Sequence, residues 1–548
     1  MRIWWEYYKK TRLIEGRSLM KATDLLVQCL ENEGVEYIFG IMGKETLDLI
    51  NSLSNSKIQF VNVRHEQGAA FMADVYGRLS NRVGICLATL GPGATNLLTG
   101  IASANLDHSP VIAITGQTSF ENQHSEAHQY LDVVKIFEPA TKWSVQIKEA
   151  QTIPKLIRKA FRVAQMEKPG AILMELPENI ASQVVPTQPL PILPIPKVAP
   201  TLQAIEDAKT IIDKCNKPLV IFGNGVIRQQ AIRELLTFIE KLQAPVIHSF
   251  MAKGVIPKDH PLNYFTFGFK KKDEVLPLIE QSDLLIVIGF DGIESPPKEW
   301  NRWKHPILHI DPLPADMEEY YPVNSELVGD LDEVINALNK LDFVAKPWAP
   351  TGGLKEKIKS AYQIDIDVKQ HLPITIESIL QVIEKNATDK TIVISDVGAH
   401  KLSIARTYQP KQAGRLIISN GFASMGIAIP GSIGAKLACP EDTVICITGD
   451  GGALMNISEL ETAKRLNLPL VIIVLNDATL KLEEQMMQEK FNNSFGTAFG
   501  NPDFVQLAES FGIKGVRPKQ INDLEVALKS GVNESNEITL IDVQLGNE

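Results

Sequence analysis

Short runs of apolar, mostly β-branched residues recur along this chain, and each ends in a glycine-rich or polar turn. They include VGICLATL, VIAITG, PLVIFGNG, DLLIVIGF, TVICITGDGG and LVIIVLND. Stretches with helical periodicity separate them. Strands that are apolar at every position and alternate with helices are typical of parallel sheets buried on both faces. We therefore predict an α/β protein built from βαβ units.

Two proline-rich stretches divide this pattern into three parts. VVPTQPLPILPIPKVAP and KPWAPTGG contain too many prolines for a helix or a central strand, so both are predicted to be extended linkers. We expect three doubly wound parallel-sheet domains in series. The predicted boundaries are 1–19 for an N-terminal extension, 20–183 for the first domain, 184–200 for a linker, 201–345 for the central domain, 346–360 for a second linker and 361–548 for the third domain.

Composition narrows the classes of partner. The 548 residues are 44% apolar and 22% charged, which is typical of a globular protein. A net charge of −10, with no basic run longer than Lys270–Lys272, argues against nucleic acid or a membrane and favours a small metabolite. Five scattered cysteines without a CxxC pair indicate reduced thiols and a cytoplasmic protein. No stretch has the character of a signal peptide or a membrane span.

Two aspartates are expected at one edge of the third sheet. The predicted strand Thr443–Thr448 runs into GDGG, and the predicted strand Leu470–Leu475 runs into NDAT. Asp450 and Asp477 thus follow consecutive strands at their carboxyl ends, where open parallel sheets bind ligands. An aspartate before glycine is often only a turn residue. Two of them at matched strand ends suit a hard divalent cation that also binds substrate phosphates.

A third carboxylate stands at the start of a helix made of small residues. In VRHEQGAAFMADVYGR, Glu66 and Gln67 precede a glycine, two alanines, a phenylalanine and a methionine. Taken alone, this is an ordinary first-turn acid that the helix dipole favours. Its neighbours would hold a carboxylate away from water, so its role depends on the rest of the chain.

GDGG followed by ND at Asn476 and Asp477 resembles the diphosphate and metal signature of thiamine-diphosphate enzymes. From Met20 onward the chain is similar to acetolactate synthases, and most closely to their catabolic branch. The similar stretches are RHEQGAAFMADVYGR, LGPGATNLLTGIASANLDHSPVIAITGQ, HQYLDVVKIFEPATKW, DVGAHKL, SNGFASMGIAIPGSIGAKL and FGNPDFVQLAESFG.

The resemblance implies thiamine diphosphate and Mg²⁺ as cofactors. Glu66 would hydrogen-bond a ring nitrogen of the aminopyrimidine, and Met425 would support the bent cofactor. Asp450, Asp477 and the Thr479 carbonyl would bind the metal. The implied cofactor-binding set is Glu66, Gly93, Asn96, His400, Ala423, Met425, Gly449, Asp450, Gly451, Gly452, Asp477, Thr479, Leu480 and Leu482.

Substrate, assembly and flavin follow from the same resemblance. Gln117, His128 and Gln129 resemble substrate-side residues, although a lone histidine is as often a plain surface group. The family builds its active site between two chains, so a homodimer is the minimum and a homotetramer is favoured. IGFDGIESPPKEWN lacks the arginine-flanked acidic motif of the flavin-binding synthases, so FAD is not expected.

The chain departs from the family pattern after Asp477. Leu480 replaces a usual tyrosine, Ser403 replaces a usual tryptophan, and Glu483 stands where relatives have an apolar residue. Glu483 is either a solvated helix acid or a group that protonates the enamine, as in simple 2-oxo-acid decarboxylases. We therefore expect a carboligase that decarboxylates pyruvate and joins the product to a second 2-oxo acid. The alternatives are a 2-oxo-acid decarboxylase that releases an aldehyde and a non-catalytic paralogue that keeps the fold.

Overall fold

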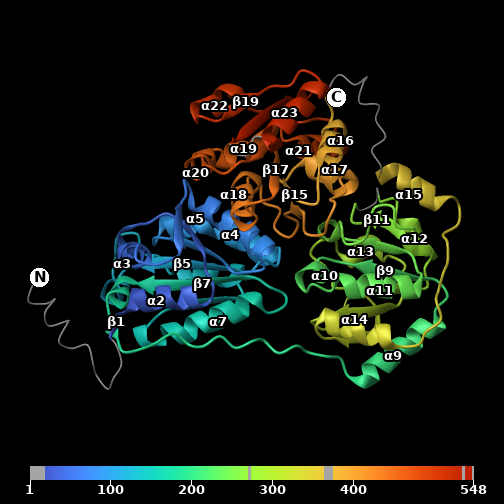
Figure 1. The fold of residues 1–548 in the computed structure, drawn as a ribbon, viewed down its shortest axis with the longest axis horizontal. Coiled ribbons are helices and arrows are strands. Elements are labelled where there is room, and N and C mark those ends of the chain that lie inside the picture. The colour runs from blue at the N-terminus through green and yellow to red at the C-terminus, as the bar shows by residue number, and fades with distance from the viewer. Residues whose placement is uncertain (1–18, 270–272, 317, 363–373, 534–536, 546–548) are drawn as a thin grey trace, which may run out of the picture. The chain divides into compact units, whose positions relative to one another are not determined.

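The computed structural model describes residues 19–269, 273–316, 318–362, 374–533 and 537–545. The predicted extension up to residue 18 and the basic run Lys270–Lys272 lie outside these residues. Three six-stranded parallel sheets follow one another along the chain, in blue, green and red in Figure 1. This confirms the predicted fold class of three α/β domains in series.

The first sheet has the strand order β3-β2-β4-β5-β7-β6, and all of its pairings are parallel. Its central strands are buried at every position, which explains their unbroken apolar sequences. Helices α2 (Ala22–Asn32) and α7 (Ile153–Gln165) contribute to the core on one face. The strands are β2 (Tyr37–Gly40), β3 (Gln59–Asn62), β4 (Gly84–Ala88), β5 (Val111–Gln117), β6 (Trp143–Gln146) and β7 (Ala171–Pro177).

A short antiparallel pair of strands joins the two ends of the first domain's sequence. Strand β1 (Met20–Lys21) pairs with β8 (Val184–Val185), which occupies the first two residues of the predicted proline-rich linker. The linker sequence after Val185 has no regular secondary structure as far as Pro200. Proline explains this, because it removes the backbone donor that a helix or ladder needs.

Helix α4 (Glu66–Ser80) lies between two other helices of small residues. It packs against α5 (Pro92–Leu106) and α18 (Ala428–Ala438) within one compact unit, which comprises the chain up to Pro194, Phe422–Pro440 and Met455–Leu468. A Cβ on Gly434 would stand only 2.3 Å from the Met72 carbonyl oxygen. The glycine and alanine content of these helices therefore permits close backbone contact, and it buries most of α4.

The second compact unit contains the central and third sheets. The central order β11-β10-β9-β12-β13-β14 reverses between β9 and β12. Doubly wound sheets bind ligands beside such a reversal. The strands are β9 (Pro218–Phe222), β10 (Val246–His248), β11 (Asn263–Thr266), β12 (Leu284–Ile288), β13 (Ile307–Asp311) and β14 (Val323–Val328), and the covering helices include α11 (Ile232–Leu242) and α14 (Leu331–Lys340).

The third sheet places the two predicted aspartate-bearing strands side by side. Its order is β16-β15-β17-β18-β20-β19, with β17 and β18 in parallel register from Ile445 and Val471 onward. Among the described residues, no helix combines the length and apolar character needed to cross a membrane. The strands are β15 (Thr391–Ser395), β16 (Leu416–Ile418), β17 (Thr443–Gly449), β18 (Val471–Asn476), β19 (Lys514–Val516) and β20 (Thr539–Gln544).

Candidate active site

Glu66 is the first residue of α4, and it is 8% exposed. Asn96 of α5 donates from Nδ2 to Glu66 Oε2 over 2.9 Å, and within the described residues it is the only donor to that carboxylate. A Cβ on Gly93 would stand 3.3 Å from Glu66 Oε1. The structure therefore brings Glu66, Gly93 and Asn96 together, and it leaves Oε1 free to meet a ligand.

The turn that precedes Glu66 is held by a buried acid that sequence analysis missed. Glu459, at the start of α20 (Glu459–Arg465), is fully buried. Its Oε1 accepts from the backbone N–H groups of Arg64 and His65 over 3.0 Å each, and its Oε2 accepts from Thr462 Oγ1 over 2.6 Å. Burial raises the pKa of Glu459. The local sequence SELETA gives no signal of this role, because the groups that Glu459 binds lie 394 and 395 positions earlier in the chain.

Gln117 ends β5 in the core rather than at a surface. Its Nε2 donates to the Leu131 carbonyl over 3.0 Å and to Glu175 Oε1 over 2.8 Å, and its Oε1 accepts from the Thr118 N–H over 3.0 Å. Burial raises the pKa of Glu175, which also accepts from Gln146, to about 7. The Gln117 amide thus makes three hydrogen bonds to other residues of the first domain.

His128 and Gln129 lie on an exposed loop. The Gln129 backbone has φ +57°, and its carbonyl oxygen would stand 2.6 Å from a Cβ on Gly91. Gly91 in turn precedes helix α5, which carries Gly93 and Asn96. The predicted substrate-side loop therefore borders the turn beside Glu66.

The segment that contains Ala423 and Met425 lies in the same compact unit as Glu66. Ala423 has φ +53°, and both residues are half-buried. The Gly426 carbonyl accepts from Asn456 Nδ2 over 2.9 Å, while Asn456 Oδ1 is buried without a partner. The turn is thus fixed by a side chain that sequence analysis did not single out.

In the second unit, Asp450 is surrounded by hydrogen-bond donors. It is 2% exposed at the end of β17. Its Oδ2 accepts from the backbone N–H groups of Asp477 and Ala478 over 3.0 and 2.6 Å, and from Asn501 Nδ2 over 2.7 Å. Its Oδ1 accepts from the Gly451 N–H over 2.7 Å. The two predicted aspartates therefore meet at adjacent strand ends.

The ionised form of the Asp477 carboxylate is disfavoured by its surroundings. Burial and the charge of Asp450 both raise its pKa. Its Oδ1 accepts from the Thr479 N–H over 3.2 Å. A divalent cation between the two carboxylates would relieve their repulsion. The described residues offer no cluster of three or more His, Cys, Asp or Glu side chains for a metal, so main-chain and ligand oxygens would have to complete the coordination.

The residues beside Asp450 fit a diphosphate. His400, near the start of α17 (Ala399–Thr407), is buried, and its Nε2 has no hydrogen-bond partner among the described residues. Burial lowers its pKa to about 4, so the ring is neutral at pH 7. A Cβ on Gly452 would stand 3.0 Å from the carboxyl group of Asp396, a fully buried acid that accepts from Thr448 Oγ1 over 3.0 Å. A buried ring nitrogen that lacks a partner, as in His400, suits a polar ligand. The glycine at position 452 lets the backbone run close to neighbouring groups there.

The segment after Asp477 is more exposed than Asp450. Leu480 and Leu482 are half-buried, and Glu483 is exposed. Glu483 stands in the first turn of α21 (Lys481–Phe491), a helix with no buried residue. The Leu480 N–H donates to the Thr497 carbonyl over 2.9 Å, which anchors the start of the helix.

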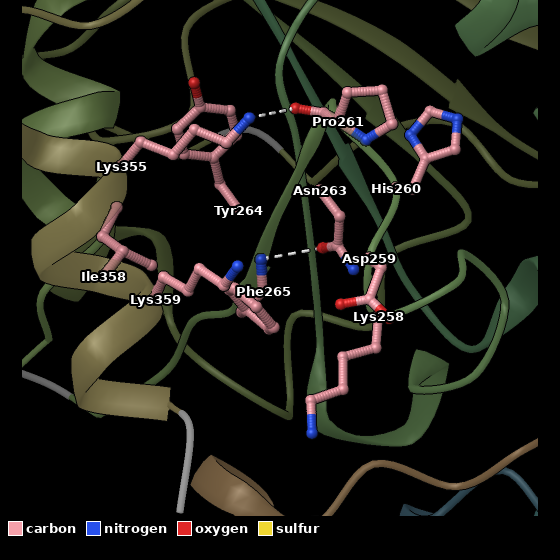
Figure 2. Close-up of a pocket in the computed structure, with 10 residues that line it drawn as sticks. All are labelled: Lys258, Asp259, His260, Pro261, Asn263, Tyr264, Phe265, Lys355, Ile358 and Lys359. Atoms are coloured by element: carbon pink, nitrogen blue, oxygen red, sulfur yellow. Dashed lines mark hydrogen bonds between the residues drawn. The ribbon is translucent and has the colours of Figure 1, made fainter. Parts of the chain in front are cut away.

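A cavity of about 120 Å³ lies against β11 and α15 (Leu354–Tyr362), and its lining includes none of these residues. Its cationic groups are mostly engaged: Lys258 pairs with Glu384, and Lys355 donates to the Pro261 carbonyl, as Figure 2 shows for the latter. We therefore do not assign the chemistry to it. The lining residues are Lys258, Asp259, His260, Pro261, Asn263, Tyr264, Phe265, Lys355, Ile358 and Lys359.

Comparison with known proteins identifies the same family in all three domains. Residues 20–136 match the family model "Thiamine pyrophosphate enzyme, N-terminal TPP binding domain", residues 205–338 match its central domain, and residues 396–543 match its C-terminal TPP binding domain. The sequence is 34% identical to an acetolactate synthase of Bacillus subtilis over 96% of this chain and 94% of that protein. It is 33% identical to a probable acetolactate synthase large subunit of Methanococcus aeolicus, over 94% of this chain and 90% of that protein. It is 31% identical to the acetolactate synthase isozyme 2 large subunit of Escherichia coli, over 94% of both chains.

Proposed function

Because this chain belongs to the acetolactate synthase family of thiamine pyrophosphate enzymes, we propose that it joins two 2-oxo acids, with pyruvate as the donor. It is an acetolactate synthase-like carboligase. The observation that carries the proposal is the pair of Asp450 and Asp477 at adjacent strand ends, together with a buried Glu66 that has one free oxygen.

The chain's own residues divide the work. Asp450, Asp477 and the Thr479 carbonyl would hold Mg²⁺, and His400 with Gly449, Gly451 and Gly452 would face the diphosphate. Glu66 would hold or release a proton at a ring nitrogen, in surroundings that exclude water. When bound, thiamine diphosphate supplies the electron sink that lets a 2-oxo acid lose carbon dioxide and attack a second carbonyl.

We also propose that no flavin is bound. At the reversal of the central sheet, the Gly225 N–H donates to the Gly289 carbonyl over 2.9 Å, and a Cβ on Gly223 would stand 2.5 Å from the same oxygen. Arg228 pairs with Asp291 beside them. The two loops are thus in direct backbone contact beside the reversal of the sheet. An absorption spectrum of the protein after incubation with FAD and desalting tests this; retained flavin absorbance would contradict it.

The proposed assembly is a homodimer at minimum, and a homotetramer is favoured. Support comes from the exposed apolar side chains on and after α21, where Met486, Phe491 and Phe495 are 60, 62 and 83% exposed. A group of this kind is typical of a surface that a partner covers. Sedimentation at several protein concentrations would give the mass of the assembly, and a monomer would contradict the proposed dimer or tetramer.

The proposed location is the cytoplasm. The five free cysteines support it, because thiols stay reduced there.

The deciding experiment is calorimetry on the stripped protein, followed by incubation with pyruvate. Thiamine diphosphate is expected to bind only with a divalent metal, and carbon dioxide is expected to appear with 2-acetolactate, which acid converts to acetoin. Acetaldehyde alone would favour the 2-oxo-acid decarboxylase. Cofactor binding without carbon dioxide from any of a panel of 2-oxo acids would favour a non-catalytic paralogue.

A further inference from the structure

Asn501, on the loop before α22 (Phe504–Ser510), holds the oxygen of Asp450 that would face away from a cation. Both hydrogens of its amide are used: Nδ2 donates to Asp450 Oδ2 over 2.7 Å and to Asn476 Oδ1 over 2.9 Å. Its own Oδ1 is buried, and the part of the chain that the structure describes offers it no hydrogen-bond partner. Turning the amide over would place that oxygen against a carboxylate, so its two acceptors fix its orientation.

A chain of hydrogen bonds supports Asn501 from behind. Asn476 donates from Nδ2 to Asp542 Oδ1 over 2.9 Å, and Asp542 is fully buried on β20. Arg517 donates to Asp542 Oδ2 from Nε over 2.8 Å and from Nη2 over 2.7 Å. The series Arg517, Asp542, Asn476, Asn501 thus ends on Asp450. Fixed donors of this kind prevent the carboxylate from rotating.

The two oxygens of Asp450 are consequently different. Oδ2 accepts from three N–H groups, which uses its lone pairs. Among the residues that the structure describes, the Gly451 N–H is the only donor to Oδ1, which keeps capacity for a further ligand. We propose that Asn501 is a positioning residue that directs Asp450 Oδ1 to Mg²⁺ and thereby sets the affinity for that metal. This inference rests on the proposed function, because it takes Asp450 as a metal ligand.

The test is a calorimetric titration of Mg²⁺ into the metal-free full-length protein in the presence of excess thiamine diphosphate, with a blank titration of Mg²⁺ into thiamine diphosphate alone. Asn501→Ala is expected to raise the Mg²⁺ dissociation constant by about tenfold or more, since loss of a group that orients a metal ligand typically costs roughly 10- to 100-fold in affinity. Asn501→Leu keeps the bulk of the side chain but removes both donors, so it is expected to weaken binding to the same extent.

Two variants calibrate the result. Glu509→Gln changes an exposed side chain on the following helix α22, outside this series, so its Mg²⁺ affinity is expected to stay within about twofold of wild type. Arg517→Gln breaks the far end of the series and is expected to weaken Mg²⁺ binding less than Asn501→Ala. Thermal unfolding of the metal-free proteins shows whether each variant is folded.

The outcomes separate the two proposals. A wild type that binds Mg²⁺, with Asn501→Leu and Asn501→Ala binding it equally well, would overturn the role of Asn501 and leave the proposed function intact. A folded wild type that needs no divalent metal for cofactor binding would overturn the proposed function itself. If Asn501→Ala does not fold, the Mg²⁺ affinity of Asn501→Leu alone tests the role of Asn501.

Discussion

Two buried carboxylates of the candidate site differ sharply in how the protein holds them. Within the described residues, Glu66 has one donor, Asn96 Nδ2, and its Oε1 is left open. Asp450 has four donors, three of them backbone N–H groups, and three of the four converge on Oδ2. Both side chains are almost fully buried, at 8 and 2% exposure.

The difference matches two chemical tasks. A carboxylate that must bind a cation works best when its direction is fixed before the cation arrives, because little ordering is then left for binding. A carboxylate that must exchange a proton with a ligand needs an oxygen that the protein does not already occupy. Asp450 fits the first description and Glu66 the second. Substitutions at each carboxylate should therefore fail in different ways.

The largest effect is expected for Asp450→Asn. An amide of the same shape would turn an NH₂ group either toward the three donors at Oδ2 or toward the cation, and both are unfavourable. Mg²⁺-dependent binding of thiamine diphosphate should weaken by more than about 100-fold, beyond the range for residues that only support a ligand. Calorimetry gives the dissociation constant of thiamine diphosphate in the presence of Mg²⁺. Asp389→Asn, an exposed carboxylate on the turn before β15, is the control; a modest loss at Asp450 would break the comparison.

Glu66→Gln is expected to separate binding from turnover. Loss of a proton-transferring group typically lowers the rate by about 10²- to 10⁴-fold, whereas the dissociation constant for the cofactor should change only a few-fold. Carbon dioxide release from pyruvate gives the rate, and calorimetry gives the affinity. If cofactor affinity falls as far as the rate does, Glu66 serves binding as Asp450 does, and the distinction between the two carboxylates is lost.

Much of this contrast could be foreseen, because it rests on local patterns. Consecutive apolar strands ending in GDGG and ND place Asp450 and Asp477 at one sheet edge, as the parallel pairing of β17 and β18 bears out. The small residues after Glu66 predict a closely packed helix, and α4 begins at that residue.

The supporting residues could not be foreseen in the same way. Asn501 contacts Asp450 across 51 positions, and Glu459 contacts His65 across 394. Such contacts depend on how distant segments fold together and leave no periodicity in the sequence. The role of Gln117 stays a prediction: its motif suggests a substrate-side residue, and in the structure its amide hydrogen-bonds Leu131, Glu175 and Thr118 in the core.

A smaller effect is expected at the single donor to Glu66. Asn96→Ala removes a hydrogen bond to a charged group, which is worth about 1.5–3 kcal/mol when buried. Part of this is recovered if water enters, so we expect roughly a tenfold loss of turnover with pyruvate. Thr95→Ala, at the exposed neighbouring position on α5, is the matched control and should leave turnover unchanged. Wild-type turnover in Asn96→Ala would mean that Glu66 is held by packing alone.

The smallest effect is expected for Glu483→Gln, which tests whether an acid beyond both carboxylates directs the products. Glu483 is exposed, and α21 buries none of its residues in this chain. Because Glu483 is solvated, we expect the ratio of acetolactate to acetaldehyde to change less than about twofold, since surface substitutions are usually near neutral. Glu484→Gln, one residue on and paired with Lys481 over 3.1 Å, is the control. Carbon dioxide, aldehyde and acetolactate should be measured together. A marked shift toward acetolactate in Glu483→Gln alone would mean that a partner chain covers α21 and that Glu483 protonates the reacting carbon, which would favour the decarboxylase over the synthase.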